Sequence, residues 1–249
     1  MKNDVVVTTW SHTSYSDIWE MYYGQYKKHA PFLDHCMMIN EIGNGFPADC
    51  TPLVNNEEER FHKRLTDSLN MINNESIIYA QEDFVLYDNV NEEYLDSLVS
   101  FLNDSDYDFI RLIKSGFHSG GDHGKLINED LHIWEIPKTC PYLYSLQATV
   151  WKRKSIIDLF SFYRPRNMMQ AELQGSNACR AIGVKGCYIY NGGSPRGSLH
   201  WDSVGYPYIS TALHGGSHGK PAQWAMTEYP ELEGMLKEYN IDPSVRGVM

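Results

Sequence analysis

Short apolar runs alternate with amphipathic segments through the first half of the chain. Three of these runs have the composition of buried strands: 4–9, 35–40 and 76–80. Between them, apolar residues recur at helical spacing from Ser16 to just before Pro31, and again over 57–73. The order strand, helix, strand, helix, strand predicts an α/β fold with an open, mostly parallel sheet and helices on both faces.

The alternation continues less regularly along the rest of the chain. The further expected elements are a helix over 91–102, strands over 109–113 and 144–150, and helices over 154–160 and 228–238. Residues 40–56 and 115–130 are expected to be irregular. Residues 188–224 are rich in Gly, Pro, His and aromatic residues and predict a long C-terminal loop region of the kind that serves a binding site. No linker interrupts the chain, so we expect a single domain over 1–249.

The composition limits the class of function. The chain carries 32 Asp and Glu against 21 Lys and Arg, a formal net charge of −11. Proteins that bind the phosphate backbone of nucleic acids carry clustered basic residues, so we expect no nucleic-acid partner. Residues 1–10 contain one Lys and only a short apolar run, which predicts no signal peptide and no membrane span. Five cysteines without a CxxC pair predict reduced thiols in a cytoplasmic protein.

Two carboxylates directly follow the third predicted strand. The apolar run 76–80 continues into Gln81, Glu82 and Asp83. Ligands of open α/β sheets bind at the carboxyl ends of the strands. A carboxylate buried there is costly unless a cation or hydrogen-bond donors compensate it, and Mg²⁺ or Mn²⁺ is typically held by one or two carboxylates plus substrate phosphates. The pattern predicts a divalent metal and a diphosphate; the alternative is that both side chains cap the following turn.

Several short segments, in chain order, are similar to segments of one known enzyme family. They are Thr8-Thr9-Trp10-Ser11, Arg60 and Arg64, Gln81-Glu82-Asp83-Phe84, Ile110-Arg111-Leu112, the segment 145–152, and Glu172 just ahead of Gly175-Ser176. With these segments the chain resembles the GT-A type nucleotide-sugar glycosyltransferases, in particular small ones of bacterial polysaccharide clusters and large DNA viruses. The resemblance is diffuse and covers most of the chain. The Gln-Glu-Asp element is similar to the family's Asp-x-Asp metal motif, with Gln81 at the position of the first Asp.

The resemblance implies transfer of a sugar from a UDP- or GDP-linked donor to a hydroxyl group of a glycan or glycoconjugate, as in polysaccharide biosynthesis. Asp83, with Glu82, would hold Mn²⁺ or Mg²⁺, which neutralises the charge that develops on the leaving diphosphate. Such families often add a His from a C-terminal loop as a metal or diphosphate contact, here His214 or His218. The same Gly-rich run would bring Lys220 to the phosphates. The alternative is a flexible loop that holds no ligand.

Glu172 is the expected general base. It follows Met168 and Met169 in an apolar context, which would raise the pKa of its carboxyl group and suit it to accept a proton from the acceptor hydroxyl. Transfer would then proceed with inversion at the sugar carbon. The alternative is an ordinary carboxylate on a helix surface. Asp122 is a weaker candidate for the same role.

The remaining candidate residues would bind the donor and the acceptor. The expected donor-binding residues are Thr8, Thr9, Trp10, Ser11, Arg60, Arg64, Glu82 and Lys220. The expected acceptor-binding residues are Trp151 and Trp201, with Trp224 as a further candidate for stacking on sugar rings. The tryptophans, Trp10 included, fit a hydrophobic core equally well, and paired arginines on a helix usually face solvent. The nucleotide-binding half would cover 1–115, and the acceptor-binding half with the C-terminal loops would cover 116–249.

Two functions from different classes fit these features. The first is a metal-assisted glycosyltransferase. The second is a module that keeps the fold and a sugar-nucleotide or glycan pocket without turnover, which the Gln at position 81 favours. A metal-dependent hydrolase with His118, His123 and His200 as ligands ranks below both, because neither an HExxH nor an HxHxD spacing occurs in the chain.

Overall fold

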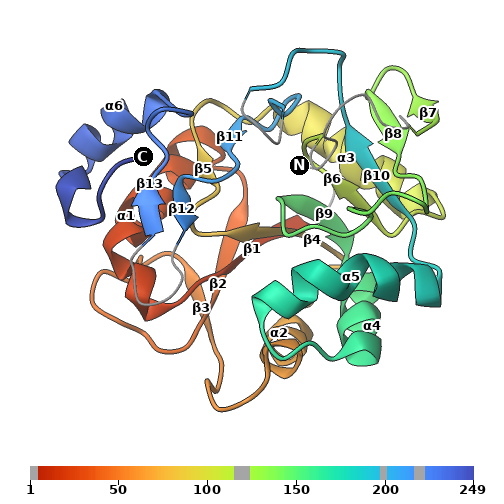
Figure 1. Ribbon diagram of the computed structural model, residues 1–249, viewed down its shortest axis with the longest axis horizontal. Coiled ribbons are helices and arrows are strands. Elements are labelled where there is room, and N and C mark those ends of the chain that lie inside the picture. Colours follow the sequence, from red (N-terminus) through yellow and green to blue (C-terminus); the bar gives the residue numbers. More distant parts are fainter. Residues whose placement is uncertain (1–4, 115–123, 197–200, 216–221) are drawn as a thin grey trace.

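The computed structural model of the chain describes residues 5–114, 124–196, 201–215 and 222–249. Figure 1 shows one large central sheet with helices packed on both of its faces. Six residues that the sequence singles out lie outside the described ranges: His118, Asp122, His123, His200, His218 and Lys220. Within those ranges, no helix combines the length and the apolar character that crossing a bilayer requires.

The central sheet has the strand order β3-β2-β1-β4-β9-β6-β10-β8-β7. Its strands are β1 (Val5–Trp10), β2 (Asp34–Ile39), β3 (Thr51–Val54), β4 (Ser76–Gln81), β6 (Phe109–Arg111), β7 (Leu126–Asn128), β8 (Ile133–Glu135), β9 (Thr149–Lys152) and β10 (Gly186–Ile189). β3, β2, β1 and β4 pair in parallel, as do β6 and β10. β9 lies antiparallel between β4 and β6, and β8 lies antiparallel between β10 and β7, so only these two strands run against the others. The expected α/β fold with an open, mostly parallel sheet and helices on both faces is confirmed.

Two hydrophobic cores lie on opposite faces of the sheet, because successive strand residues point in opposite directions. In β1, Val5 and Val7 pack into one core and Val6 into the other. The first core contains apolar residues of α1 (Ser16–His29), α3 (Glu92–Asp104) and α6 (Glu231–Glu238). The second contains residues of α2 (Phe61–Asn70), α4 (Arg153–Tyr163) and α5 (Met168–Ile182). Short 3₁₀ helices, η1 (Thr13–Tyr15) and η2 (Pro243–Val245), precede α1 and follow α6.

His35 places a titratable ring inside the first core. Its Nε2 lies 2.6 Å from Thr9 Oγ1, and the rings of Tyr22, Tyr23 and Tyr26 surround it at centroid distances of 5.4, 5.5 and 4.8 Å. Burial lowers the pKa of His35 to about 3. Between that value and the unfolded pKa near 6.5, the unfolded chain binds the extra proton, so the stability that neutral His35 contributes is lost as the pH falls.

We therefore expect His35→Gln, which keeps a polar group near Thr9 without the titration, to change the pH dependence of unfolding. The free energy of unfolding of the wild type should fall by about 2 kcal/mol more than that of the variant between pH 7.5 and pH 5. Urea unfolding at the two pH values measures the difference. An equal loss in both proteins would show that His35 is not desolvated.

The C-terminal region covers the end of β4. β11 (Tyr208–Ile209) pairs with β5 (Val85–Leu86), and β12 (Leu213–Gly215) pairs with β13 (Ala222–Trp224). The backbone N–H of Ala212 donates to the Asp83 carbonyl at 3.1 Å. Figure 1 shows β11 and β12 beside β5, on the α1 side of the sheet. The expected long loop thus includes short strands that hold it against the turn after β4.

Some elements differ from expectation. The loop expected over 40–56 contains β3, whose Pro52 is tolerated because β3 is an edge strand and Pro needs no ladder partner there. The strand expected over 144–150 starts only at Thr149, because Tyr144 and Leu146 pack into the second core from irregular chain. α5, β7, β8 and β10 were not expected, and α2 begins four residues later than the pattern predicts, at Phe61.

Candidate functional site

The carboxyl ends of the parallel strands meet at one edge of the sheet. Trp10 at the end of β1 is paired with Gln81 at the end of β4. Arg111 ends β6 opposite Tyr188 of β10. β9, which runs the other way, begins at this edge. In open α/β folds this edge is where ligands bind, so the residues that follow these strands are the first candidates for a site.

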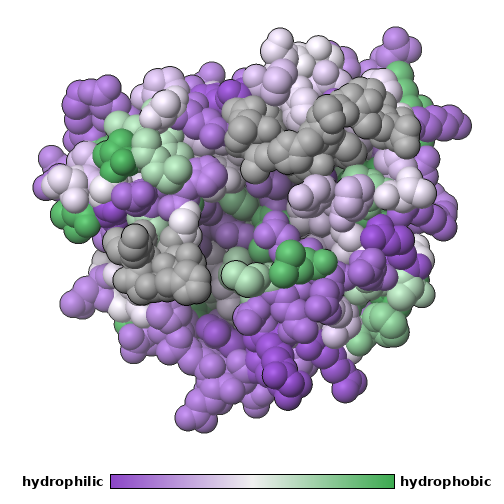
Figure 2. Space-filling model, in the orientation of Figure 1, coloured by the Kyte–Doolittle hydropathy of each residue, from purple (hydrophilic) through white to green (hydrophobic). Residues whose placement is uncertain are grey.

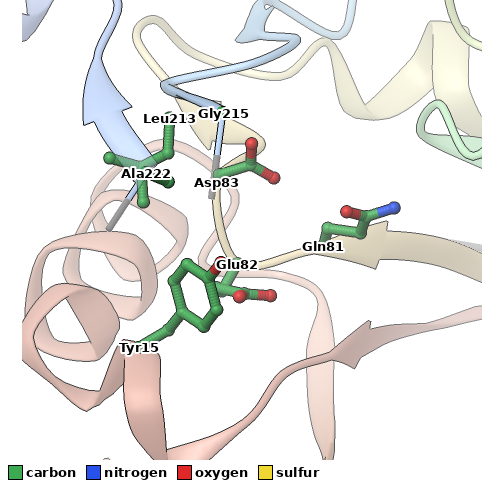
Figure 3. Close-up of a pocket in the computed structure, with 7 residues that line it drawn as sticks. All are labelled: Tyr15, Gln81, Glu82, Asp83, Leu213, Gly215 and Ala222. Atoms are coloured by element: carbon green, nitrogen blue, oxygen red, sulfur yellow. The ribbon is translucent and has the colours of Figure 1, made fainter. Parts of the chain in front are cut away.

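A small polar pocket lies at the end of β4. Its volume is about 160 Å³, and it is lined by Tyr15, Gln81, Glu82, Asp83, Leu213, Gly215 and Ala222. Figure 3 shows Glu82 beside the Tyr15 ring, and Asp83 beneath the β12 segment at Leu213 and Gly215. In Figure 2 the same face is hollowed near its centre, on the border of the region that the β12–β13 pair occupies in Figure 1. The acidic pair therefore faces a cavity in the structure, as the position of the pair in the sequence predicts.

The turn after β4 is held in place by backbone hydrogen bonds. The N–H of Phe84 donates to the Gln81 carbonyl at 3.0 Å and closes the turn. The backbone of Leu213 donates a hydrogen bond to the Asp83 carboxylate, and Ala212 donates to the Asp83 carbonyl at 3.1 Å. Asp83 is thus positioned by the C-terminal segment as well as by its own strand.

Both carboxyl groups are desolvated. Burial, and to a smaller extent the nearby charge of Asp83, raise the pKa of Glu82 to about 8. Burial also raises the pKa of Asp83 to about 7, although hydrogen bonds from the Asp83 and Leu213 backbone lower it. The Arg246 guanidinium, which donates to Asp17 at 2.5 and 2.7 Å and lies over the Tyr15 ring, lowers the pKa of Glu82, and the charge of Asp17 raises it. Two adjacent carboxylates in this setting are stabilised when a cation enters.

The donor set fits a hard divalent cation. Glu82 and Asp83 offer carboxylate oxygens and Gln81 an amide oxygen around one cavity, the oxygen ligands that Mg²⁺ and Mn²⁺ prefer. Within the described ranges, no group of three or more His, Cys, Asp or Glu side chains could hold a metal by itself. A cation here would complete its shell with water and substrate oxygens, as Mg²⁺ usually does.

His214 lies in β12 between Leu213 and Gly215, which line the pocket, but His214 itself is not among the lining residues. Its expected role as a metal or diphosphate contact stays a prediction.

Glu172 lies in the second turn of α5 and reaches the same edge of the sheet. Although the residue as a whole is exposed, burial of its carboxyl group raises the pKa of Glu172, while a hydrogen bond from the Leu146 backbone and the charge of Arg111 lower it. The Leu146 carbonyl in turn accepts a hydrogen bond from Gln81 Nε2 at 3.5 Å. Leu146 therefore joins the candidate base to the strand end that carries the acidic pair.

Two exposed apolar side chains accompany Glu172 on α5. Met169 is 69% and Leu173 74% exposed. In Figure 2 a hydrophobic patch lies over the N-terminal half of α5, next to the central hollow. The N-terminal half of α5, which carries Glu172, therefore borders the hollow.

The side chains at the end of β1 are engaged inside the fold. Thr8 Oγ1 donates to the Ile78 carbonyl at 3.3 Å, and Thr9 Oγ1 lies 2.6 Å from both Tyr22 Oη and His35 Nε2. Ser11 Oγ accepts a hydrogen bond from Trp19 Nε1 at 2.7 Å. The expectation that these side chains line a nucleotide pocket is corrected, because all three are buried and their hydrogen bonds are internal.

Trp10 and Arg64 are brought together beside the end of β1. Trp10 is 7% exposed and packs edge-on against Phe61, with ring centroids 4.7 Å apart. The Arg64 guanidinium lies 5.0 Å from the Trp10 ring centroid, and its Nε donates to Asn55 Oδ1 at 2.6 Å. Arg60 is exposed at the N-terminus of α2. Of the expected donor residues in this half, Arg64 is the cation that the fold places at the sheet edge.

The tryptophans separate into core and site residues. Trp151 is 2% exposed and packs against Phe109 with ring centroids 4.3 Å apart, and Trp224 is fully buried. The expectation that Trp151 stacks on a sugar is therefore wrong, because both faces of its ring are covered. Trp201 is half-buried and lies against Lys114 and Tyr190, two residues that carry no recognisable pattern in the sequence.

Comparison with known proteins finds similar solved structures but no match by sequence. No family model matches the sequence, and no curated protein matches it. The chain is similar to the CMP:2-keto-3-deoxy-manno-octonic acid synthetase complexed with CTP, at 10% identity over 84% of this chain and 94% of that chain, with a TM-score of 0.47. It is similar to mannosyltransferase PcManGT from Pyrobaculum calidifontis in complex with GDP-Man and Mn²⁺, at 12% identity over 74% of this chain and 56% of that chain, with a TM-score of 0.47. It is also similar to S. aureus TarS 1–349, at 10% identity over 79% and 59%, with a TM-score of 0.46.

Proposed function

We propose that the protein is a nucleotide-sugar-dependent glycosyltransferase that moves a sugar from a nucleoside diphosphate donor to a hydroxyl group of a glycan acceptor. One observation carries the proposal: two adjacent, desolvated carboxylates, Glu82 and Asp83, line a cavity at the carboxyl end of a central parallel strand. Such a pair favours a divalent cation, and a cation at this edge favours a substrate that brings phosphate oxygens. A nucleoside diphosphate sugar fits such a site, because its diphosphate brings the phosphate oxygens that bind the cation.

In this proposal Asp83 and Glu82 hold Mn²⁺ or Mg²⁺ at the cavity. When bound, the ion supplies Lewis-acid neutralisation of the charge that develops on the diphosphate. Asp83 is fixed for this role by hydrogen bonds from Leu213 and Ala212. Arg64 lies beside the end of β1, in the half of the chain expected to bind the nucleotide. There it would contact the phosphates or the base of the donor.

Glu172 acts as the general base of the proposed reaction. Its carboxylate accepts the proton of the acceptor hydroxyl while the acceptor oxygen bonds to the anomeric carbon. The bond from that carbon to the donor phosphate oxygen breaks, and the nucleoside diphosphate leaves with its electron pair. A raised pKa suits this role because the carboxylate is then a stronger base towards the proton of the acceptor hydroxyl. Attack opposite to the leaving group inverts the configuration at the sugar carbon.

The test is release of nucleoside diphosphate from a panel of UDP- and GDP-linked sugars. We expect release from at least one donor with Mn²⁺, loss of release with EDTA, and recovery when Mn²⁺ is restored in excess. Most of the rate should depend on the ion, because leaving-group neutralisation contributes several kcal/mol to such a reaction. Release at the same rate with and without EDTA would contradict the proposed role of the acidic pair.

A binding module without turnover is the second candidate function. It is favoured by Gln81, whose amide replaces a carboxylate and donates to the Leu146 carbonyl at 3.5 Å. The same panel separates the two: calorimetric binding of a nucleotide sugar without release of nucleoside diphosphate, even with an acceptor mixture present, identifies the module.

A further inference from the structure

A charged side chain is buried between two aromatic rings at the carboxyl edge of the sheet. Lys114 is 4% exposed, and its Nζ lies 4.1 Å from the Tyr190 ring centroid and 4.3 Å from that of Trp201. The N–H of Trp201 donates to the Lys114 carbonyl at 3.2 Å, so the two residues are joined through the backbone as well. We call Lys114, Tyr190 and Trp201 the lysine bracket.

Further contacts hold the residues of the lysine bracket together. The Tyr190 carbonyl accepts from Trp134 Nε1 at 2.8 Å, and Tyr190 Oη donates to the Gly193 carbonyl at 3.0 Å. The Tyr190 and Trp201 rings meet edge to face, with centroids 6.0 Å apart. A cation held over aromatic faces away from water is a stabilising contact that fixes the rings it touches. Trp201 thus contacts both Lys114 and Tyr190 while remaining half-buried rather than buried.

The lysine bracket and the expected nucleotide-binding residues at the end of β1 lie at different points along the carboxyl edge of the sheet. Lys114 follows β6, and Tyr190 directly follows β10, which pairs with β6. β4 and β6 both pair with β9, so their carboxyl ends are one strand apart, roughly 10 Å. The end of β1, with Trp10 and Arg64, lies on the opposite side of β4. An in-line displacement places the attacking hydroxyl opposite the leaving diphosphate, which puts the acceptor on the β6–β10 side.

We propose that the lysine bracket is a carbohydrate-binding subsite for the acceptor, in which Trp201 stacks on a sugar ring and Lys114 and Tyr190 are positioning residues that hold its indole. The assignment to the acceptor rests on the proposed function. The CH groups of a pyranose face pack on an aromatic ring, and its hydroxyl groups remain free for solvent or protein. A glycan longer than one residue would span from Trp201 towards Glu172 and the acidic pair.

The test measures glycan binding without donor, so that it is independent of turnover. The probes are cellohexaose, maltohexaose and chitohexaose at millimolar concentrations, followed by tryptophan fluorescence and by calorimetry. At least one should bind. Trp201→Ala should weaken its binding about tenfold, and Trp201→Phe should retain most of it because a ring remains. Phe162→Ala is the matched control, since Phe162 is an aromatic residue 58% exposed on α4.

Variants at Lys114 test the positioning role. Lys114→Met keeps the length of the side chain without the charge and should weaken glycan binding about fivefold, whereas Lys114→Arg should restore it. Thermal melting separates this loss of binding from unfolding, because a structural defect would also lower the melting temperature of Lys114→Met. The KM for the acceptor should rise in Lys114→Met with little change in kcat.

Donor hydrolysis distinguishes a failure of this inference from a failure of the proposed function. Trp201→Ala should lower the rate of transfer to the glycan more than the rate of transfer to water, because water needs no stacking platform. An equal fall of the two rates would place Trp201 on the donor and overturn the inference. Absence of binding to every hexasaccharide, or equal binding by wild type and Trp201→Ala, also overturns it. Glycan binding that depends on Trp201, in a protein that turns over no donor, would support the subsite and contradict the transferase.

Discussion

Replacing Asp83 by asparagine is expected to lower nucleoside diphosphate release from the sugar donor by about a thousandfold or more. The amide keeps an oxygen that can accept the Leu213 hydrogen bond, so the turn after β4 and the C-terminal segment should stay in place. It removes the charge that holds a divalent cation, and a loss of about 4 kcal/mol of transition-state stabilisation corresponds to a thousandfold change in rate.

The matched control is Asp67→Asn, which removes an exposed carboxylate paired with Lys63 on α2. This variant should keep wild-type activity, because an exposed ion pair of this kind contributes little to the stability of the fold. The melting temperature of Asp83→Asn should not fall, since a desolvated carboxylate is removed. Activity of Asp83→Asn within tenfold of wild type would exclude Asp83 as the metal ligand.

Replacing Glu172 by glutamine is expected to lower sugar transfer to the acceptor by about a hundredfold to ten-thousandfold, the range that a general base contributes. Binding of nucleoside diphosphate with Mn²⁺ should be unchanged, because Glu172 lies on α5 rather than at the acidic pair. Rapid-quench measurement of transfer, with calorimetry of nucleotide binding alongside, separates the two effects. Glu93→Gln on α3 is the carboxylate control.

The pH profile gives a second readout for Glu172. Only the carboxylate form accepts a proton, so the transfer rate should rise with pH through the raised pKa of Glu172 and level off above it. Measured at saturating Mn²⁺, where the ion keeps Glu82 and Asp83 ionised, the acid limb should disappear in Glu172→Gln. Persistence of that limb in the variant, at a similar rate, would assign the base to another residue.

The fold follows from the sequence wherever apolar periodicity is strong. The strands at β1, β2 and β4 and the helices α1 and α3 were predicted within a few residues, because each buries a continuous apolar run or stripe. α5 was missed because Gly175 and Ser176 break its apolar stripe where it packs closely against Tyr144. The short strands of the C-terminal region depend on partners far away in the chain, such as β5 for β11, and leave no local pattern.

The candidate site was predictable only in part. The acidic pair was found because a polar dipeptide ends a fully apolar strand, and the cavity beside it agrees with that position. Thr9 and Ser11 look like ligand-binding residues in the sequence, but in the structure their hydroxyl groups form hydrogen bonds with His35 and Trp19 inside the core. The roles proposed for Lys114 and Tyr190 depend on the pairing of β6 with β10, which no spacing along the chain reveals.

The most direct test of the central claim is the position of Mn²⁺ in crystals grown with Mn²⁺ and UDP or GDP. Anomalous scattering at the manganese edge locates the ion without reference to the protein density. We expect one peak within coordination distance of the Asp83 carboxylate and of the nucleotide diphosphate, at the carboxyl end of β4. A bound nucleotide whose diphosphate lies elsewhere, or a manganese peak away from Glu82 and Asp83, would contradict the account.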